Sequence, residues 1–341
     1  MLQFSKYERP ATVEEALAIV QKVKGARVIG GGVWLRLQDR RIARAIDLSA
    51  CGLDRIERVD WETGAPATGD GPTPGDAWGV GAMVTLHQLE AHGGFNASTC
   101  GVYESAVRDI VGVQMRNVAT VGGSLFGRFG FSDILTALLP LECEVELAGE
   151  GRVPLAEFAA RKAYERDILT RVLVRDARDL RSGFACVRRS ATDFSVLNVC
   201  AARVGGSWHV AVGARPGRAV LLPAEAVAAL SEALTAGVPQ APAATVDEAT
   251  ASLSPQAVAA LDAACEAASA LPLGSNMRGS ARYRRHLAAA LTRRVVLEAA
   301  GLLAPAPAPA PAARPQAGAA HAAAQVAASP EGVPTPEGGE A

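Results

Sequence analysis

One segment constrains the fold more than any other part of the chain: Val107 to Leu147, VRDIVGVQMRNVATVGGSLFGRFGFSDILTALLPLECEVEL. At its centre, Thr120-Val121-Gly122-Gly123-Ser124 places two glycines after a β-branched pair. Such glycines allow positive φ and a close approach of the backbone to a ligand, and consecutive free N–H groups form a nest for phosphate oxygens. The hydroxyls of Thr120 and Ser124 can donate to the same oxygens. The pattern predicts either a phosphate-binding loop or a tight structural turn.

Apolar runs flank this glycine pair and predict helices on both sides. Val107–Val113 is consistent with a short helix before it, and Ile134–Leu141 with a helix after it. Ser132 and Asp133 stand directly before the second run. Two roles remain open for Asp133: its carboxylate can accept hydrogen bonds from sugar or ribityl hydroxyls, or it can cap the helix, because Ser and Asp are both preferred N-cap residues.

A second glycine-rich loop lies near the N-terminus. The capping box Thr12-Val13-Glu14-Glu15 begins a helix to about Lys24, and Ala26–Ile29 predicts a short buried strand. That strand leads into Gly30-Gly31-Gly32-Val33-Trp34-Leu35, which predicts a cradle for dinucleotide phosphates but lacks the G-x-G-x-x-G of a nicotinamide Rossmann domain. Three positions remain open for the Trp34 ring: against an adenine, against the loop, or in the core.

The remaining chain mixes strand-like and helix-like runs, the pattern of an α+β fold. Strands are predicted at Arg44–Leu48, Leu53–Val59, Trp78–Thr85, Asp167–Val174, Phe184–Arg189, Phe194–Ala202 and Trp208–Val212. Helices are predicted at Leu86–Ala91, Glu157–Arg161, Leu221–Thr235, Ser254–Ala270 and Tyr283–Val295. The Gly/Pro/Asp-rich stretch Trp61–Trp78 predicts a long hairpin connection.

Composition excludes several classes of function. The 34 basic and 35 acidic residues are balanced and no basic patch is interleaved with aromatics, so no nucleic acid partner is expected. No long uninterrupted apolar run occurs outside the Ala/Pro-rich tail, so no membrane span is expected. The six cysteines are scattered singly without C-x-x-C, which argues against zinc or iron–sulfur ligation and predicts reduced thiols in a cytoplasmic protein.

Several motifs together resemble the FAD-binding (medium) subunit of the molybdenum hydroxylases. That family includes subunits of xanthine dehydrogenase, carbon monoxide dehydrogenase and nicotinate dehydrogenase. Arg116–Ser124 is similar to its R-N-x-A-T-x-G-G-[NS] motif, followed here by S-D and E-V-E-L. Gly30–Leu35 is similar to its first FAD loop, G-G-T-[DS]-L, with Val33 and Trp34 replacing the threonine and the polar residue. Trp78–Thr85 resembles its I-G-A-x-[VT]-T strand, and Arg278–Arg284 its R-G-S-x-x-Y-R signature.

The resemblance covers roughly residues 1–300 and implies an α+β architecture. Residues 1–176 are expected to form a vanillyl-alcohol-oxidase-type (PCMH-type) FAD-binding domain with subdomains at 1–57 and 58–176. Residues 177–302 are expected to form a small α+β C-terminal domain with a three-stranded sheet. The Ala/Pro/Gly-rich residues 303–341 cannot bury a core and are expected to be a disordered tail.

The resemblance also implies that FAD is bound non-covalently between the two glycine loops. The implied FAD-binding residues are Ile29, Gly30, Gly31, Gly32, Val33, Trp34, Leu35, Thr120, Val121, Gly122, Gly123, Ser124, Ser132, Asp133 and Leu169, the last near the flavin ring. No catalytic side chain and no metal ligand is expected. Where the family often carries a lysine near the flavin, this chain has Cys186 or Val187, so Arg188 or Arg189 would have to supply the charge.

The implied function is the FAD-binding subunit of a multi-subunit molybdenum hydroxylase. Its expected partners are a molybdopterin-binding large subunit and a 2Fe-2S small subunit. Electrons would reach FAD from the iron–sulfur clusters and leave as a hydride to NAD⁺ or to another acceptor. Two alternatives remain open: a self-contained flavin oxidase or reductase of the same superfamily, and a flavin-free scaffold subunit, which the departures at Val33 and Trp34 favour.

Overall fold

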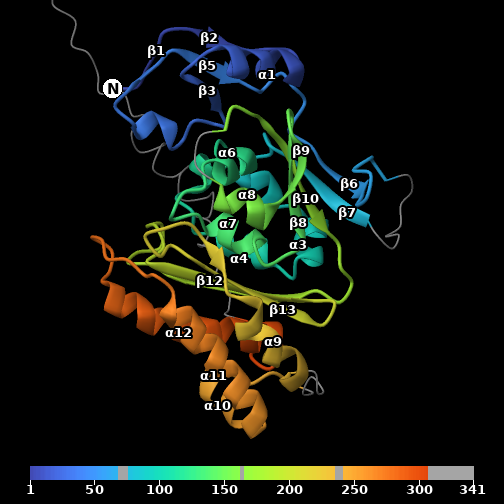
Figure 1. Ribbon diagram of the computed structural model, residues 1–341, viewed down its shortest axis with the longest axis vertical. Helices are drawn as coiled ribbons and strands as arrows, with labels where there is room; N and C mark the ends of the chain where they lie inside the picture. The colour runs from blue at the N-terminus through green and yellow to red at the C-terminus, as the bar shows by residue number, and fades with distance from the viewer. Residues whose placement is uncertain (68–75, 162–164, 235–240, 306–341) are drawn as a thin grey trace, which may run out of the picture. The chain divides into compact units, whose positions relative to one another are not determined.

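A computed structural model of the protein describes residues 1–67, 76–161, 165–234 and 241–305. The middle of the predicted 61–78 connection and nearly all of the predicted 303–341 tail lie outside these residues. Residues 1–304 form one compact unit, built from three main sheets and their helices (Figure 1). Among the described residues, no helix is both long and apolar enough to cross a membrane.

The N-terminal region contains a small parallel sheet in the order β2-β5-β3. Its strands are β2 (Tyr7–Glu8), β5 (Arg44–Asp47) and β3 (Ala26–Ile29), with a separate parallel pair of β1 (Gln3–Phe4) and β4 (Arg41–Ile42). Helix α1 (Val13–Lys22) begins at Thr12, whose hydroxyl accepts from the Glu15 N–H as the capping box predicts. Ala16 and Val20 are the buried side chains of this helix.

The central region contains a five-stranded antiparallel sheet in the order β6-β7-β10-β8-β9. Its strands are β6 (Ile56–Asp60), β7 (Asp76–Gly81), β10 (Leu169–Arg175), β8 (Cys143–Leu147) and β9 (Gly151–Pro154). Its helices are α2 (Leu86–Glu90), α3 (Gly93–Ser98), α4 (Val102–Val107), α5 (Val113–Arg116), α6 (Val121–Phe126), α7 (Asp133–Leu138) and α8 (Leu155–Ala160). The predicted subdomain boundary at residue 57 falls inside β6.

The C-terminal region contains a four-stranded antiparallel sheet, not the three-stranded sheet that was predicted. Its strands are β11 (Arg181–Val187), β12 (Leu197–Val204), β13 (Ser207–Gly213) and β14 (Val220–Leu221). The additional strand, β14, has only two residues, so its sequence shows no alternation that could reveal it. The helices are α9 (Ala224–Ala233), α10 (Val246–Ala251), α11 (Pro255–Ala270) and α12 (Ala281–Ala299).

Strand β12 is buried on both faces and belongs to two cores. Cys200 and Ala202 pack into the core of the central region, whereas Val199 and Ala201 pack into a second core with α11 and α12. This follows from the period of two in a strand, which turns successive side chains to opposite faces. Figure 1 shows β12 and β13 between α4 and α7 on one side and the C-terminal helices on the other.

One helix prediction was wrong, and another helix begins later than predicted. Residues 107–113 do not form a helix: α4 ends at Val107, α5 begins at Val113, and Val111 between them has φ 45°. The predicted Leu221–Thr235 helix is shorter, because Val220 and Leu221 pair with β13 and Pro223 precedes the first turn of α9. Helix α10 was not predicted, although its capping box of Thr245 and Glu248 is visible in the sequence.

Candidate functional site

The loop after β3 has the geometry that a phosphate nest requires. Gly31 and Gly32 have φ of 76° and 70°, in the left-handed region that favours glycine. The backbone N–H groups of Gly31 to Trp34 donate to no acceptor among the described residues. A short 3₁₀ turn, η1 (Leu35–Leu37), follows directly. Consecutive free N–H groups of this kind form a concavity for an anion.

The Thr120–Ser124 segment has a different structure, and the prediction that it forms a second nest was wrong. Thr120 caps α6, and both glycines lie inside that helix without positive φ. All four N–H groups that follow Thr120 have protein acceptors: Val121 donates to the Val84 carbonyl at 2.9 Å, Gly122 to the Ala82 carbonyl at 2.9 Å, Gly123 to Thr120 Oγ1 at 3.1 Å and Ser124 to the Thr120 carbonyl at 3.1 Å. The carbonyls of Ala82 and Val84, directly after β7, thus accept from two of the N–H groups that the sequence suggested were free for a ligand, and Thr120 accepts from the other two.

The two glycine segments nevertheless touch each other. A Cβ atom on Gly30 would lie 2.7 Å from Thr120 Oγ1, and one on Gly31 would lie 1.7 Å from the Val118 carbonyl oxygen. A Cβ on Gly122 would lie 2.6 Å from the Ala82 Cβ. These glycines therefore let backbone pack on backbone. Gly32 is different, because the nearest atom to its Cβ position is Ile29 Cγ2 at 3.5 Å, which leaves that side of the loop open.

Trp34, at the end of the free N–H run, belongs to a cluster of aromatic rings. Its ring centroid lies 4.8 Å from that of Phe131, 5.6 Å from Phe129 and 5.8 Å from Phe194. The Arg278 guanidinium lies 4.7 Å from the Phe194 centroid. All four rings are half-buried, so this cluster offers apolar faces beside the anion nest. A nest for a pyrophosphate next to aromatic surface for fused rings fits FAD.

The sequence comparison decides the family. Residues 2–174 match the family described as the FAD binding domain in molybdopterin dehydrogenase. The chain belongs to this family. FAD is therefore the cofactor of this domain, and the resemblance inferred from the motifs is confirmed.

Individual relatives of this FAD-binding domain are distant. The uncharacterized protein YgfM of Escherichia coli (strain K12) is 24% identical over 176 residues, which is 50% of this chain and 59% of that protein. The chain thus spans less than two thirds of the length of the curated relatives that it matches.

Solved structures share the fold along most of the chain. Carbon monoxide dehydrogenase from Oligotropha carboxidovorans has a chain with TM-score 0.66 and 22% identity, covering 87% of this chain and 97% of that one. Quinoline 2-oxidoreductase from Pseudomonas putida 86 gives TM-score 0.66 and 22% identity, covering 88% and 98%. The predicted α+β, PCMH-type fold with a C-terminal domain is confirmed.

In this FAD-binding domain, Asp133 is not the helix cap. The cap of α7 is Ser132, whose hydroxyl accepts from the Leu135 N–H at 3.1 Å. The Asp133 side chain is 5% exposed and pairs with Arg188 Nη2 at 2.8 Å. Burial opposes the positive charge of Arg188, but its charge interactions and hydrogen bonds with Asp133 and Cys186 together raise the pKa of the guanidinium.

The Asp133 carboxylate also joins α7 to the C-terminal sheet. Its Oδ1 accepts from Ser195 Oγ and Asn198 Nδ2, both at 2.5 Å. Three protein donors thus engage the Asp133 carboxylate, which was predicted to accept from cofactor hydroxyls. The positive charge of Arg188, suggested to lie near the flavin, is compensated by Asp133. A contact between Asp133 and FAD stays a prediction.

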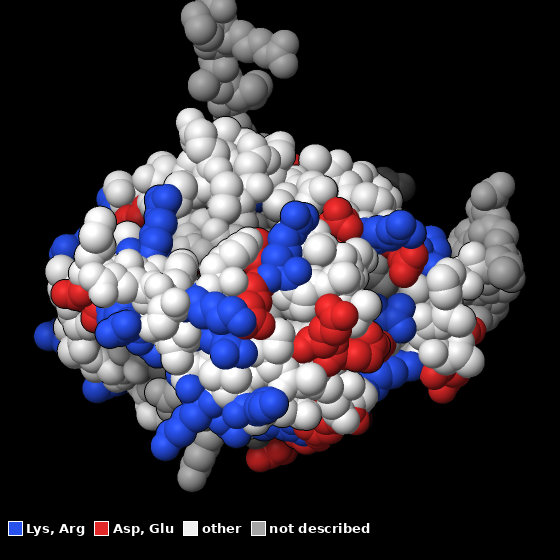
Figure 2. All heavy atoms as spheres, turned by 90° about the horizontal axis from the view of Figure 1, so that it is seen from above, with Lys and Arg blue, Asp and Glu red and all other residues white. Residues whose placement is uncertain are grey.

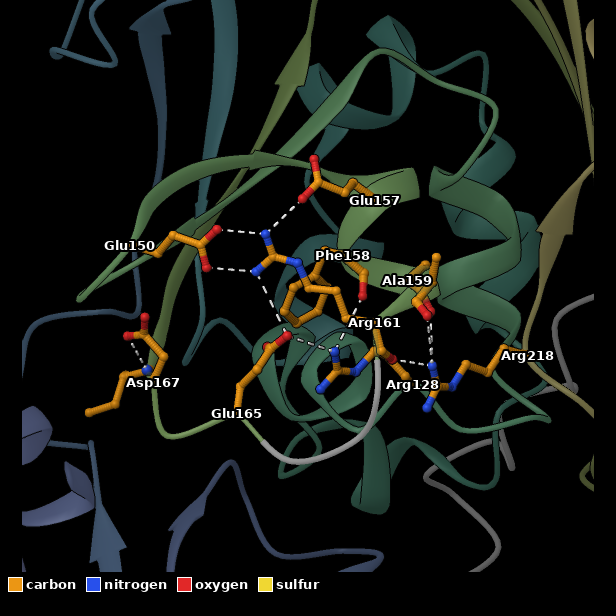
Figure 3. A network of polar contacts seen from close by, with 11 residues as sticks. Arg128, Glu150, Glu157, Phe158, Ala159, Arg161, Glu165, Asp167 and Arg218 are labelled. Carbon is orange, nitrogen blue, oxygen red and sulfur yellow. Dashed lines mark hydrogen bonds and ion pairs between the residues drawn. The ribbon is translucent and has the colours of Figure 1, made fainter. Parts of the chain in front are cut away.

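A second buried charge network holds the segment that carries the aromatic rings (Figure 3). Arg128 has φ 44°, is 3% exposed, lies 4.5 Å above the Phe158 ring and pairs with Glu165 at 3.3 Å. Burial lowers the pKa of Arg128. Arg218 donates to carbonyls at the end of α8, including Ala159 at 3.3 Å. Arg128 Nη1 also donates to the Phe158 carbonyl at 3.3 Å, which holds it against α8, and the following Phe129 and Phe131 reach Trp34.

The remaining predicted site residues lie at strand ends. Ile29 is the last residue of β3, and Leu169, 4% exposed, is the first residue of β10. The carbonyl of Thr170 accepts from the Ala82 N–H at 2.8 Å, which brings this strand beside the start of α6. The proximity of Leu169 to the flavin ring stays a prediction.

Sequence reasoning missed the three phenylalanines around Trp34. A signal for them exists, because the chain has only 8 phenylalanines and two of them form the Phe129-Gly130-Phe131 repeat just before Ser132. On the face shown in Figure 2, basic and acidic side chains lie interspersed, in keeping with their nearly equal numbers.

Proposed function

We propose that this chain is the FAD-binding subunit of a multi-subunit molybdenum hydroxylase. In this role it accepts electrons from iron–sulfur clusters of a partner and passes them to NAD⁺ or another acceptor. Family membership supports the cofactor, and the free N–H groups of Gly31 to Trp34 carry the assignment of its site. When bound, FAD supplies the exchange between single electrons and a hydride, while the protein binds and orients it.

In this proposal, different residues of the chain have different roles in binding and orienting FAD. Gly31, Gly32, Val33 and Trp34 donate backbone N–H groups to the pyrophosphate, with Ile29, Gly30 and Leu35 forming the ends of the loop. The Thr120–Ser124 segment supports that loop from behind through the Gly30 and Gly123 contact. The aromatic cluster around Trp34 excludes water on one side, and Leu169, Ser132 and Asp133 bound the site from β10 and α7.

The partners in this proposal are a molybdopterin-binding large subunit and a 2Fe-2S small subunit. The singly scattered cysteines support placing all metal centres on partner chains, because iron–sulfur clusters need clustered thiolates. We also infer a cytoplasmic location. All six cysteines are free thiols, and burial raises the pKa of the Cys143 and Cys200 thiols, which keeps them protonated and unreactive.

The test is the visible spectrum and activity of the purified full chain. Flavin bands at about one FAD per chain, reduction of a dye with NADH, and no oxidation of N-heterocycles or aldehydes are expected. A folded chain that takes up no FAD would instead support the alternative that this chain is a flavin-free scaffold subunit. Oxidation of a heterocycle by this chain alone would instead support the alternative that it is a self-contained flavin oxidase or reductase.

A further inference from the structure

A cavity of about 610 Å³ lies on the outer face of the five-stranded sheet. Strand alternation separates the two faces of β10: Val172 and Val174 pack into the same core as residues of α6, α7 and α8, whereas Arg171 lines the cavity. None of the residues from Gly31 to Trp34 lines this cavity, so it is separate from the nest loop. Its volume lies in the range of small-molecule sites.

Charged side chains form a row across the floor of this cavity. The strand register places Arg171 opposite Gly81 on β7 and opposite Glu146 on β8. Arg55, directly before β6, continues the row, because its carbonyl accepts from the Gly81 N–H at 2.9 Å. Residues directly opposite each other in an antiparallel sheet point to the same face. A Cβ on Gly81 would lie 2.2 Å from the Leu53 carbonyl oxygen, so this position carries no side chain and leaves a gap between the two arginines.

Several of the charged groups in the cavity retain hydrogen-bonding capacity. Arg171 donates through Nε to Glu146 at 2.8 Å, and its two terminal amino groups donate to no acceptor in the described part of the chain. Arg55 and Glu57 point to the same face two positions apart, yet neither forms a hydrogen bond or ion pair through its side chain with any described residue. The cavity therefore offers donors and acceptors of opposite charge side by side.

The charges that line the cavity balance, which indicates the charge of its ligand. The charged lining residues are Arg55, Arg152, Arg171, Glu14, Glu57 and Glu146. A ligand with a net charge would leave groups of the opposing sign without a partner, whereas a zwitterion satisfies both signs. Neighbouring residues on one face of a strand lie roughly 7 Å apart. A carboxylate and an ammonium group on the same carbon fit between two side chains at that separation.

We propose that this cavity binds a free α-amino acid with an apolar side chain. Arg55 and Arg171 donate to its carboxylate, because guanidinium groups match the planar geometry of a carboxylate. Glu57 accepts from its ammonium group. Val13 and Leu17 of α1, which are half-buried, form an apolar wall for its side chain. This site does not depend on the proposed electron-transfer function.

The test is calorimetric titration of the full chain saturated with FAD. The probes are leucine, isocaproate, which lacks the ammonium group, and isoamylamine, which lacks the carboxylate. The wild-type chain should bind leucine at least about tenfold more tightly than either analogue, because each analogue loses one charged hydrogen-bonding group. Absence of saturable leucine binding, or an analogue that binds as tightly as leucine, would overturn the proposal.

Two variants assign the charges of the ligand to individual side chains. Arg55→Gln should weaken the binding of leucine and isocaproate about tenfold and leave that of isoamylamine unchanged. Glu57→Gln should weaken the binding of leucine and isoamylamine by a similar factor and should not weaken that of isocaproate. Both variants should keep the wild-type melting temperature, because neither side chain pairs with a described residue.

The matched control is Arg282→Gln, because Arg282 is an exposed arginine on α12 that does not line the cavity. This variant should bind all three probes as the wild type does. Leucine binding that survives unchanged in both Arg55→Gln and Glu57→Gln would place the amino acid elsewhere on the chain and overturn the site. Equal losses for all three probes in both variants would show a general distortion of the cavity and would also overturn the assignment.

Discussion

The nest loop at Gly31–Trp34 and the start of α6 at Thr120–Ser124 look alike in the sequence but differ in structure. Both have adjacent glycines beside β-branched residues. In the first, the glycines have positive φ and their N–H groups meet no acceptor in the part of the chain that the structure describes; in the second, the glycines are helical and their N–H groups have protein acceptors. A glycine pair thus indicates close approach, but its sequence does not say whether the approaching group is a ligand or another part of the backbone.

The largest expected effect comes from glycines that contact backbone in both segments. Gly31→Ala should destabilise the fold by about 4 kcal/mol through overpacking and left-handed strain, and Gly122→Ala by about 3 kcal/mol through overpacking alone. Urea unfolding measures this loss. Near wild-type stability for either variant would show that the backbone contacts are looser than the 1.7 and 2.6 Å approaches indicate. Loss of FAD in these variants would not by itself identify a ligand contact.

The next largest effect tests whether Asp133 stabilises the fold or binds the cofactor. Asp133→Asn should cost about 3 kcal/mol of folding stability, because it leaves the Arg188 charge buried without its partner. The matched change Asp193→Asn, at a partly exposed carboxylate 3.5 Å from Arg278, should cost less than about 1 kcal/mol. Denaturant unfolding and FAD titration are compared for both. Unchanged stability with weakened FAD binding in Asp133→Asn would restore the carboxylate as a cofactor ligand.

A smaller effect tests the nest itself. Gly32→Ala and Gly52→Ala introduce the same backbone strain, because their φ angles are 70° and 69° and neither Cβ would clash. Both should lose about 1 kcal/mol of stability. Only Gly32→Ala should weaken FAD binding, by about tenfold or 1.4 kcal/mol, because its methyl group enters the nest. Equal dissociation constants for the two variants would remove the nest from the cofactor site.

The smallest effect concerns the cap of α6. Thr120→Val should cost about 1 kcal/mol of stability by leaving the Gly123 N–H without an acceptor, whereas Thr120→Ser should keep the cap. FAD affinity should be unchanged in both, since Thr120 is 3% exposed and supports the loop from behind. A drop in FAD affinity for Thr120→Val without loss of stability would make the hydroxyl a direct ligand donor.

Local patterns predicted most elements, and the errors have identifiable physical causes. The helix capped by Thr12, the strand at residues 26–29 and the helix capped by Ser254 form as expected, because their signals act within one or two turns. The helix predicted at 107–113 fails because the Arg116 side chain accumulates contacts with two carbonyls and Glu90, which compete with helical hydrogen bonds. The Arg284 side chain, whose contacts no local pattern indicates, is fully buried and donates to the Val196 and Gly274 carbonyls.

The sequence by itself determined the family, the α+β class and the two glycine segments, because the order of motifs and the period of apolar residues can be read without knowing which residues touch. Only the tertiary structure decided what each polar group meets. The Gly122 N–H group, for example, is bonded only because the Ala82 carbonyl, directly after β7 and far from α6 in the sequence, lies within reach of it, whereas the Gly32 N–H group meets no acceptor among the described residues. The same holds for Trp34, whose three ring partners come from distant parts of the chain. Hydrogen bonds and ring contacts form between groups that are close in space, whatever their separation along the chain, so local sequence cannot specify them.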